Sequence, residues 1–162
     1  MLTDLKKGGT FLLNCPWSVE ELDEKLPAEM KNMIAKKNIK FYIIDAIKIV
    51  SEIGLGNRIN SVMQAGFFKL ANVINYDDAE NYMKAAVKKS YGRKGDAIVN
   101  MNCAAIDNAI SGLIKVDYPE SWATIKTGAA LTLSTDDNYF VNVINPILAQ
   151  KGDSLPVSAF NP

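Results

Sequence analysis

Two short apolar runs decide the fold: TFLLN at residues 10–14 and IKFYII at residues 39–44. Each run has the length and composition of a strand that is buried on both faces of a parallel sheet. Helix signals lie between them, because Ser18 followed by Glu21 predicts a capping box and Asn38 is expected to end the helix. A strand, a helix and a strand in this order predict a βαβ unit, and therefore an α/β fold.

Helical patterns dominate the rest of the chain. Further helices are expected over residues 46–53, 57–70, 77–92, 96–113 and 138–149. Two strands are few for so many helices. The predicted class is therefore a small parallel sheet flanked by several helices, in an incomplete three-layer α/β/α domain.

The two ends and the missing strands favour a piece of a larger domain. Residues 1–7 are expected to form the last turn of a helix that stops at Gly8, and residues 152–162 are expected to be extended. A third strand is expected either within residues 129–134 or in sequence outside these 162 residues. The helix and strand signals weaken from Tyr118 onward, where Pro119, Gly128 and the polar cluster STDD at 134–137 lie. An irregular linker is therefore expected over residues 123–137, between segments 1–122 and 138–162.

The charge balance excludes some partners. Lysine plus arginine and aspartate plus glutamate each number 18, so the formal net charge is zero and no electrostatic footprint for nucleic acid is expected. No apolar run has the length of a membrane span, and the N-terminus has no secretory signal pattern. A cytoplasmic location, away from membranes, is expected.

The absence of histidine removes whole classes of mechanism. Ser-His and Cys-His couples are impossible, and Cys15 and Cys103 are the only cysteines. A [4Fe–4S] cluster takes four cysteine ligands and a structural zinc site takes four from cysteine and histidine. The two cysteines are therefore expected to be reduced core residues, without a disulfide between them.

The segment Gly54-Leu55-Gly56-Asn57-Arg58 is the best local candidate for a binding site. A Gly-x-Gly turn that opens a helix offers backbone N–H groups and a positive dipole end to an anion, with Arg58 nearby. The competing interpretation, which we favour, is a tight connection between helices in which glycine supplies a positive φ. Asp45 follows a strand, where open α/β sheets place ligands, but a helix N-cap is the favoured role.

The remaining conspicuous side chains are interpreted as structural. Core or interdomain packing is expected for Met63, Phe67, Phe68 and Met83, packing for Trp17 and Trp122, and a solvated face for Lys84, Lys88 and Lys89.

Six segments carry a resemblance that covers nearly the whole chain. They are KGGTFLLNCPWS at 7–18, ELDEKLP at 21–27, KNIKFYIIDA at 37–46, EIGLGNRIN at 52–60, MQAGFFKL at 63–70 and VINPILAQKGDSLPVSAF at 143–160. In this order they resemble the pyruvate:ferredoxin (flavodoxin) oxidoreductase family. The resemblance implies that residues 1–122 are the second half of the third, gamma-type domain, and that residues 138–162 begin the following small domain.

The same resemblance implies a role inside a larger cytoplasmic enzyme. Members of the family convert pyruvate and coenzyme A to acetyl-CoA and CO₂ with thiamine diphosphate and Mg²⁺, and pass electrons through [4Fe–4S] clusters to ferredoxin or flavodoxin. A homodimer is implied for the full enzyme. The family's CxxC-type motifs and the glycine-rich loop that begins its third domain are absent from this sequence. No catalytic, cofactor-binding or metal-binding residue is therefore carried over.

The expected function is a structural, interdomain-contact segment of such an oxidoreductase, which is inactive alone and contacts other domains of the same polypeptide. Two alternatives remain. The first is a small-molecule or phosphate-binding α/β domain that uses the turn from Gly54 to Arg58, and the second is a self-associating interaction module.

Overall fold

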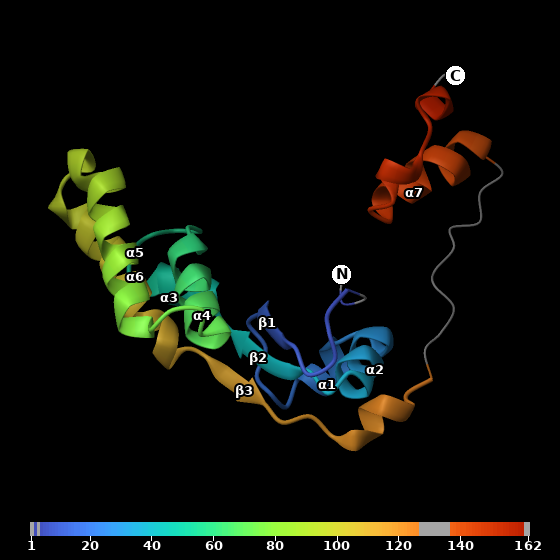
Figure 1. Ribbon diagram of the computed structural model, residues 1–162, viewed down its shortest axis with the longest axis horizontal. Coiled ribbons are helices and arrows are strands. Elements are labelled where there is room, and N and C mark those ends of the chain that lie inside the picture. The colour runs from blue at the N-terminus through green and yellow to red at the C-terminus, as the bar shows by residue number, and fades with distance from the viewer. Residues whose placement is uncertain (1, 3, 127–136, 161–162) are drawn as a thin grey trace. The chain divides into compact units, whose positions relative to one another are not determined.

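The computed structural model describes all residues except 1, 3, 127–136 and 161–162 (Figure 1). The chain divides into two compact units, Met1–Thr127 and Gly128–Pro162. The strand predicted within residues 129–134 lies outside the described residues, as does most of the predicted linker.

The first unit is built on two parallel strands, as predicted. Strand β1 (Thr10–Asn14) pairs with β2 (Lys40–Ile44), with Thr10 opposite Lys40 and Asn14 opposite Ile44. Strand β2 is mostly buried, but all five residues of β1 are only half-buried. Leu12 packs against one core and Phe11 and Leu13 pack against another, so both faces of β1 are in contact with other residues, but the expectation that the strand is fully buried is wrong.

A third strand joins the sheet from the opposite side of β2. Strand β3 (Ile114–Val116) runs antiparallel to β2, with Ile43 opposite Ile114, and the sheet order is β1-β2-β3. The sheet is thus mixed, not purely parallel. Strand β3 has no local strand pattern in the sequence, because its three residues lie close behind a helix and include a lysine.

The connection from β1 to β2 contains the predicted capping box. The Ser18 N–H donates to the Glu21 carboxylate at 2.8 Å, and the Glu21 N–H donates to the Ser18 hydroxyl at 3.4 Å. The box precedes a single turn, α1 (Leu22–Lys25), and the main helix α2 (Ala28–Lys36) begins after Pro27. Asn38 then takes a positive φ of 51° and ends the helix, as expected.

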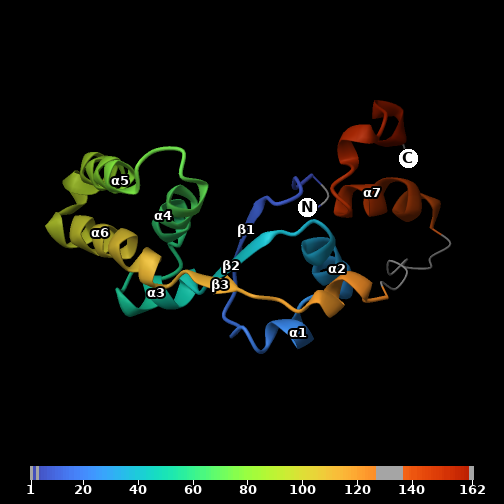
Figure 2. The ribbon, with the colours of Figure 1, turned by 60° about the horizontal axis from the view of Figure 1, so that its bottom comes forward.

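Four helices fill the chain between β2 and β3, close to the predicted boundaries. They are α3 (Ala46–Glu52), α4 (Asn60–Ala71), α5 (Tyr76–Tyr91) and α6 (Asp96–Ser111), with a 3₁₀ turn, η1 (Gly92–Lys94), between the last two. They pack together beyond one end of the strands, and α4 also contacts β1 (Figure 2). Their core includes Val50, Val62 and Ile106, and the strand residues Leu12 and Ile44 pack into it.

The other face of the sheet is covered by a separate core. Phe41 and Ile43 of β2 and Val116 of β3 pack there with Ile34 of α2. Trp122, on the 3₁₀ turn η2 (Glu120–Thr124), completes this core and is 2% exposed. The small sheet is thus flanked by helices, as predicted, with α4 against β1 and the core of α2 against β2 and β3.

The N-terminal segment differs from its prediction. Residues 2 and 4–8 form turns, not the end of a helix. The Lys37 ammonium group donates hydrogen bonds to the carbonyl oxygens of Leu2 at 3.1 Å and Leu5 at 2.8 Å. These bonds hold the segment against the end of α2.

The second unit is helical over residues 138–148, as expected. A π-helix, η3 (Phe140–Ile144), leads into α7 (Asn145–Leu148), which has Pro146 in its first turn. Two 3₁₀ turns follow, η4 (Gly152–Ser154) and η5 (Val157–Phe160). The prediction of an extended tail is therefore wrong over residues 152–160. Among the described helices of both units, none is long and apolar enough to cross a membrane.

Candidate interaction surface

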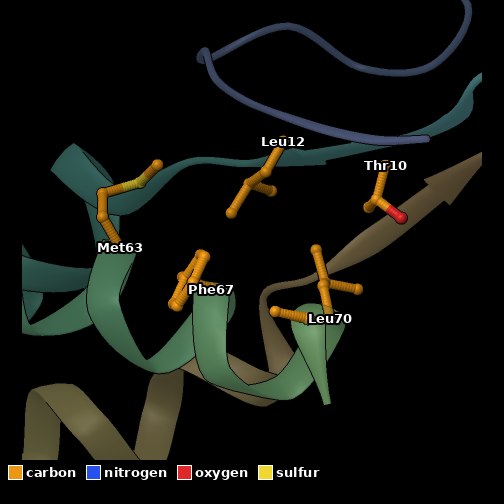
Figure 3. Close-up of a pocket in the computed structure, with 6 residues that line it drawn as sticks. Thr10, Leu12, Met63, Phe67 and Leu70 are labelled. Atoms are coloured by element: carbon orange, nitrogen blue, oxygen red, sulfur yellow. The ribbon is translucent and has the colours of Figure 1, made fainter. Parts of the chain in front are cut away.

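An apolar hollow of about 280 Å³ lies between β1 and α4 (Figure 3). The side chains of Thr10 and Leu12 point into it from the strand, and those of Met63, Phe67 and Leu70 face them from the helix. Ala71 completes the lining. The Thr10 hydroxyl is the only polar side-chain group in this set, so the hollow suits apolar side chains and not a charged ligand.

A glycine on α4 allows the helix to approach the strand. Gly66 is buried, and a Cβ atom at this position would lie 3.0 Å from Leu12 Cδ2. The next residue, Phe67, is 55% exposed, and its ring makes an edge contact with Phe68 at 5.4 Å between centroids. An exposed phenylalanine beside an apolar hollow forms an exposed apolar patch, which is typical of a surface that binds another protein segment.

The four residues predicted to pack in a core or between domains, Met63, Phe67, Phe68 and Met83, differ in burial. Met83 is buried among α3–α6, whereas Met63 and Phe68 are half-buried at the edge of that core. Packing in the core is therefore confirmed for Met83. Phe67 is the exposed member of the set, and the buried positions of α4 are Val62, Ala65 and Gly66.

The turn Gly54–Arg58 connects α3 to α4. Gly54 and Gly56 have φ values of +83° and +62°, which confirms that the glycines supply the left-handed backbone. Leu55 between them is buried, and the Arg58 side chain is exposed. The residues thus form the tight connection expected from the sequence, and anion binding at this turn stays a prediction.

Asp45 caps a helix, as predicted. Its carboxylate accepts a hydrogen bond of 2.9 Å from the Lys48 N–H in the first turn of α3. Asn14 Oδ1, at the end of β1, accepts a second bond of 2.9 Å from the Ala46 N–H. Side chains at the ends of both parallel strands therefore satisfy the first turn of this helix, and Asp45 is structural.

Both cysteines are free. Cys15 is buried, and this burial, followed by the nearby Asp45 carboxylate, raises the pKa of its thiol despite a hydrogen bond with the Trp17 backbone. Cys103 is half-buried on α6. Within the described part of the chain, no three cysteine, aspartate or glutamate side chains gather where they could hold a metal ion.

Lys84 departs from the solvated face predicted for it. Its ammonium group lies 2.6 Å from Glu80 Oε1 and 2.5 Å from Asp107 Oδ1, so it joins α5 to α6. The hydrogen bonds with Asp107 and then Glu80 raise its pKa above the usual lysine value. Lys88 and Lys89 are exposed, as predicted. The pair between Lys84 and Asp107 could not be predicted from local spacing, because Asp107 lies on another helix.

The chain matches a family profile and is similar in sequence to segments of much longer proteins. Residues 1–112 match the profile of the family described as pyruvate ferredoxin/flavodoxin oxidoreductase. The chain is 53% identical over its whole length to a pyruvate:ferredoxin oxidoreductase of Moorella thermoacetica, and covers 14% of that protein. It is 46% identical over 99% of its length to a pyruvate-flavodoxin oxidoreductase of Klebsiella pneumoniae, again covering 14%. A pyruvate dehydrogenase [NADP(+)] of Cryptosporidium parvum is 42% identical, with 10% covered.

Proposed function

Because this chain belongs to the pyruvate ferredoxin/flavodoxin oxidoreductase family, we propose that it acts as an interdomain-contact segment of a pyruvate:ferredoxin (flavodoxin) oxidoreductase. Such an enzyme oxidatively decarboxylates pyruvate with coenzyme A to acetyl-CoA and CO₂, and passes the electrons to ferredoxin or flavodoxin. The segment alone is inactive. Its role is to present a folded surface to other parts of the same polypeptide, since the chain spans 14% of the length of the first two relatives.

The exposed apolar surface at β1 and α4 is the observation that carries this proposal. Phe67 is 55% exposed beside a hollow lined mainly by aliphatic and aromatic side chains. Contiguous apolar surface of this kind marks a contact with another protein surface. A segment that meets neighbouring domains of a large enzyme has a use for such a surface, whereas an independent small-molecule enzyme would need converging polar groups as well.

The [4Fe–4S] clusters of the proposed enzyme do not fit the residues of this segment. Thiamine diphosphate with Mg²⁺ would supply the stabilised carbanion and [4Fe–4S] clusters the electron transfer in the complete enzyme. The chain has two cysteines and no histidine, which is too few thiolates for one cluster. We therefore assign no cofactor to this segment and derive no catalytic step through it.

The proposal extends to the organisation of the chain. Residues 1–122 belong to the third, gamma-type domain, residues 123–137 form a linker, and residues 138–162 begin the next small domain. The division of the chain into units at residues 127 and 128 supports a boundary in this region. The full enzyme is a cytoplasmic homodimer in this proposal.

A pair of substitutions on α4 tests the proposed contact. In the complete enzyme carrying these 162 residues, Phe67→Asp should lower both the apparent Tm and the rate of pyruvate-dependent viologen reduction. Gln64→Asp, an exposed position about one turn earlier, is the matched control and should change neither. In the 162-residue chain, Phe67→Asp should lower the Tm much less, because more than half of the Phe67 side chain is already exposed to water. Equal behaviour of the two variants in the complete enzyme would contradict the proposal.

A ligand titration separates this role from an independent binding domain. We expect no thermal shift of the 162-residue chain with coenzyme A, with thiamine diphosphate plus Mg²⁺, or with pyruvate. A saturable shift with one of them, lost in Arg58→Ala, would replace the proposal with a binding function at the Gly54–Arg58 turn.

A further inference from the structure

The backbone of β1 has one paired side and one open side. Two hydrogen bonds fix which groups face β2: the Lys40 N–H donates to the Gly9 carbonyl at 2.8 Å, and the Cys15 N–H donates to the Ile44 carbonyl at 3.0 Å. In a parallel pair, every second residue directs both backbone groups at the same neighbour. The odd-numbered residues of β1 therefore face β2.

The even-numbered residues of β1 direct their backbone groups away from β2. These are Thr10, Leu12 and Asn14, and within the described residues the sheet ends on this side, because β1 is the first strand in the order β1-β2-β3. An unpaired strand edge offers N–H and C=O groups to any further strand that approaches. Thr10 and Leu12 also line the hollow, so the open edge and the apolar hollow adjoin at the same two residues (Figure 3).

The two outer strands of the sheet differ in how they are protected. Strand β3 has three residues, and its central residue, Lys115, is exposed. A short strand with a lysine resists the addition of another strand. Strand β1 has five residues, TFLLN, with neither a charge nor a proline. Its composition is typical of a central strand and not of an edge strand.

The hollow is placed to receive the side chains of an added strand. Neighbouring strands lie about 4.8 Å apart, and alternate side chains share one face. A strand beside β1 would therefore place every second side chain on the same face as Thr10 and Leu12, against Phe67 and Leu70 of α4. Small or medium apolar side chains would fill the hollow and cover the exposed ring of Phe67.

We propose that the edge of β1 pairs with an additional β-strand, which comes from the part of the oxidoreductase polypeptide outside these 162 residues and inserts apolar side chains into the hollow against α4. This inference rests on the proposed function and makes it specific, since it names the backbone groups that form the contact. The relatives supply ample polypeptide for such a strand, because the chain covers 14% of their length.

Residue-resolved hydrogen exchange of the 162-residue chain and of the complete enzyme carrying it tests the pairing. In the chain alone, the Phe11 and Leu13 amides should be protected by β2, and the Thr10 and Leu12 amides should exchange fast. In the complete enzyme, exchange at Thr10, Leu12 or both should slow by at least about tenfold, since protection follows the free energy of opening. Which of the even amides are protected reports the register of the added strand.

Three other results would overturn the inference, and they are distinguishable. If the α4 surface gains protection in the enzyme but Thr10 and Leu12 do not, the strand is absent and the proposed function stands. If nothing in the segment gains protection, the proposed function fails as well. If Thr10 and Leu12 become protected in the chain alone as its concentration rises, and no further in the enzyme, the occupant is a second copy.

A matched pair of variants at one position isolates the backbone contribution. Thr10→Pro removes an N–H that points away from β2, at the first residue of a strand, where proline is tolerated. Thr10→Ala keeps that N–H and removes the hydroxyl. In the complete enzyme, Thr10→Pro should abolish the added protection at Leu12 and Thr10→Ala should retain it, while Leu13 stays protected in both. Equal protection at Leu12 in the two variants would count against pairing of the Thr10 N–H with the added strand.

Discussion

Trp122 Nε1 donates a hydrogen bond of 2.7 Å to Asp23 Oδ1, which joins residues 99 positions apart in the chain. Lys31 lies over the same indole ring, 5.8 Å from its centroid, and forms an ion pair of 3.4 Å with Asp23. Tyr118 stacks on Trp122 with 5.5 Å between centroids, and its hydroxyl donates a 2.8 Å bond to the Ile39 carbonyl. These contacts fasten the segment after β3 across α2.

The contribution of these contacts to the free energy of unfolding should depend on pH, because the Asp23 carboxylate can be protonated. The hydrogen bond from Trp122, and then that from Lys31, lower the pKa of Asp23 below its usual value of 3.8. A carboxyl group whose pKa is lower in the folded state stabilises the fold above its unfolded pKa, and this contribution is lost as the pH falls through the folded pKa. The stability advantage of the wild type over Asp23→Asn should therefore be constant near neutrality and shrink below pH 3.8.

The measurement uses the fluorescence of Trp122 in a Trp17→Phe background, because the chain has two tryptophans. Urea denaturation of this protein and of its Asp23→Asn variant at a series of pH values gives the difference in free energy of unfolding. A difference that stays constant down to about pH 3 would show that the Asp23 charge does not stabilise the contact.

The ion pair between Lys84 and Asp107 should couple α5 to α6. Because Asp107 is partly exposed, Lys84→Met and Asp107→Asn are each expected to lower the free energy of unfolding by about 1 kcal/mol or less. The double variant should reveal a coupling energy of roughly 0.5–1 kcal/mol, reduced by high salt. Lys88→Met, one turn along on the exposed side of α5, is the control and should stay within about 0.5 kcal/mol. Additive single effects in urea denaturation would mean that the two charges do not interact.

The close approach of α4 to β1 should not tolerate a large side chain at Gly66. A Cβ there would lie 3.0 Å from Leu12 Cδ2 and 3.5 Å from Leu113 Cδ2, so Gly66→Leu is expected to lower the free energy of unfolding by about 1–3 kcal/mol through overpacking. Gly92→Leu is the control, because a Cβ there meets nothing within 4 Å and its φ of −54° suits any residue. Thermal denaturation of the two variants compares them. Similar losses of stability in the two variants would show that the close contact between Gly66 and Leu12 does not restrict the size of the side chain at residue 66.

Local patterns were sufficient to predict the elements whose signals lie within a few residues. The apolar runs of β1 and β2, the Ser18–Glu21 capping box and the Asp45 cap were predicted because each depends on adjacent sequence. The N-terminal segment was predicted incorrectly, although two lysines before a pair of glycines are typical of a helix end. Its turns are held instead by Lys37, which lies about thirty residues away.

Features that depend on distant partners could not be predicted. Residues 114–116 form strand β3 because they pair with the backbone of β2. Lys84 forms an ion pair because Asp107 of α6 lies beside it. The surface at β1 and α4 was predicted only in part. Phe67 belonged to a set expected to pack in a core or between domains, but periodicity could not identify it as the member left exposed.

The pairing of Ile43 with Ile114 has a consequence for the order of folding. These two residues enclose about seventy residues of chain, and closing a loop of that length in a disordered chain carries a substantial entropy cost. Helices α3 to α6 pack together within this stretch, with α6 in contact with α3, α4 and α5. Once this helical block has formed, it draws the two ends of the stretch together and shortens the loop that remains to be closed. Strand β3 should therefore lock into the sheet late. Because α3 to α6 begin after β2 and end before its partner β3, this helical insertion can also change in length while β2 and β3 stay paired.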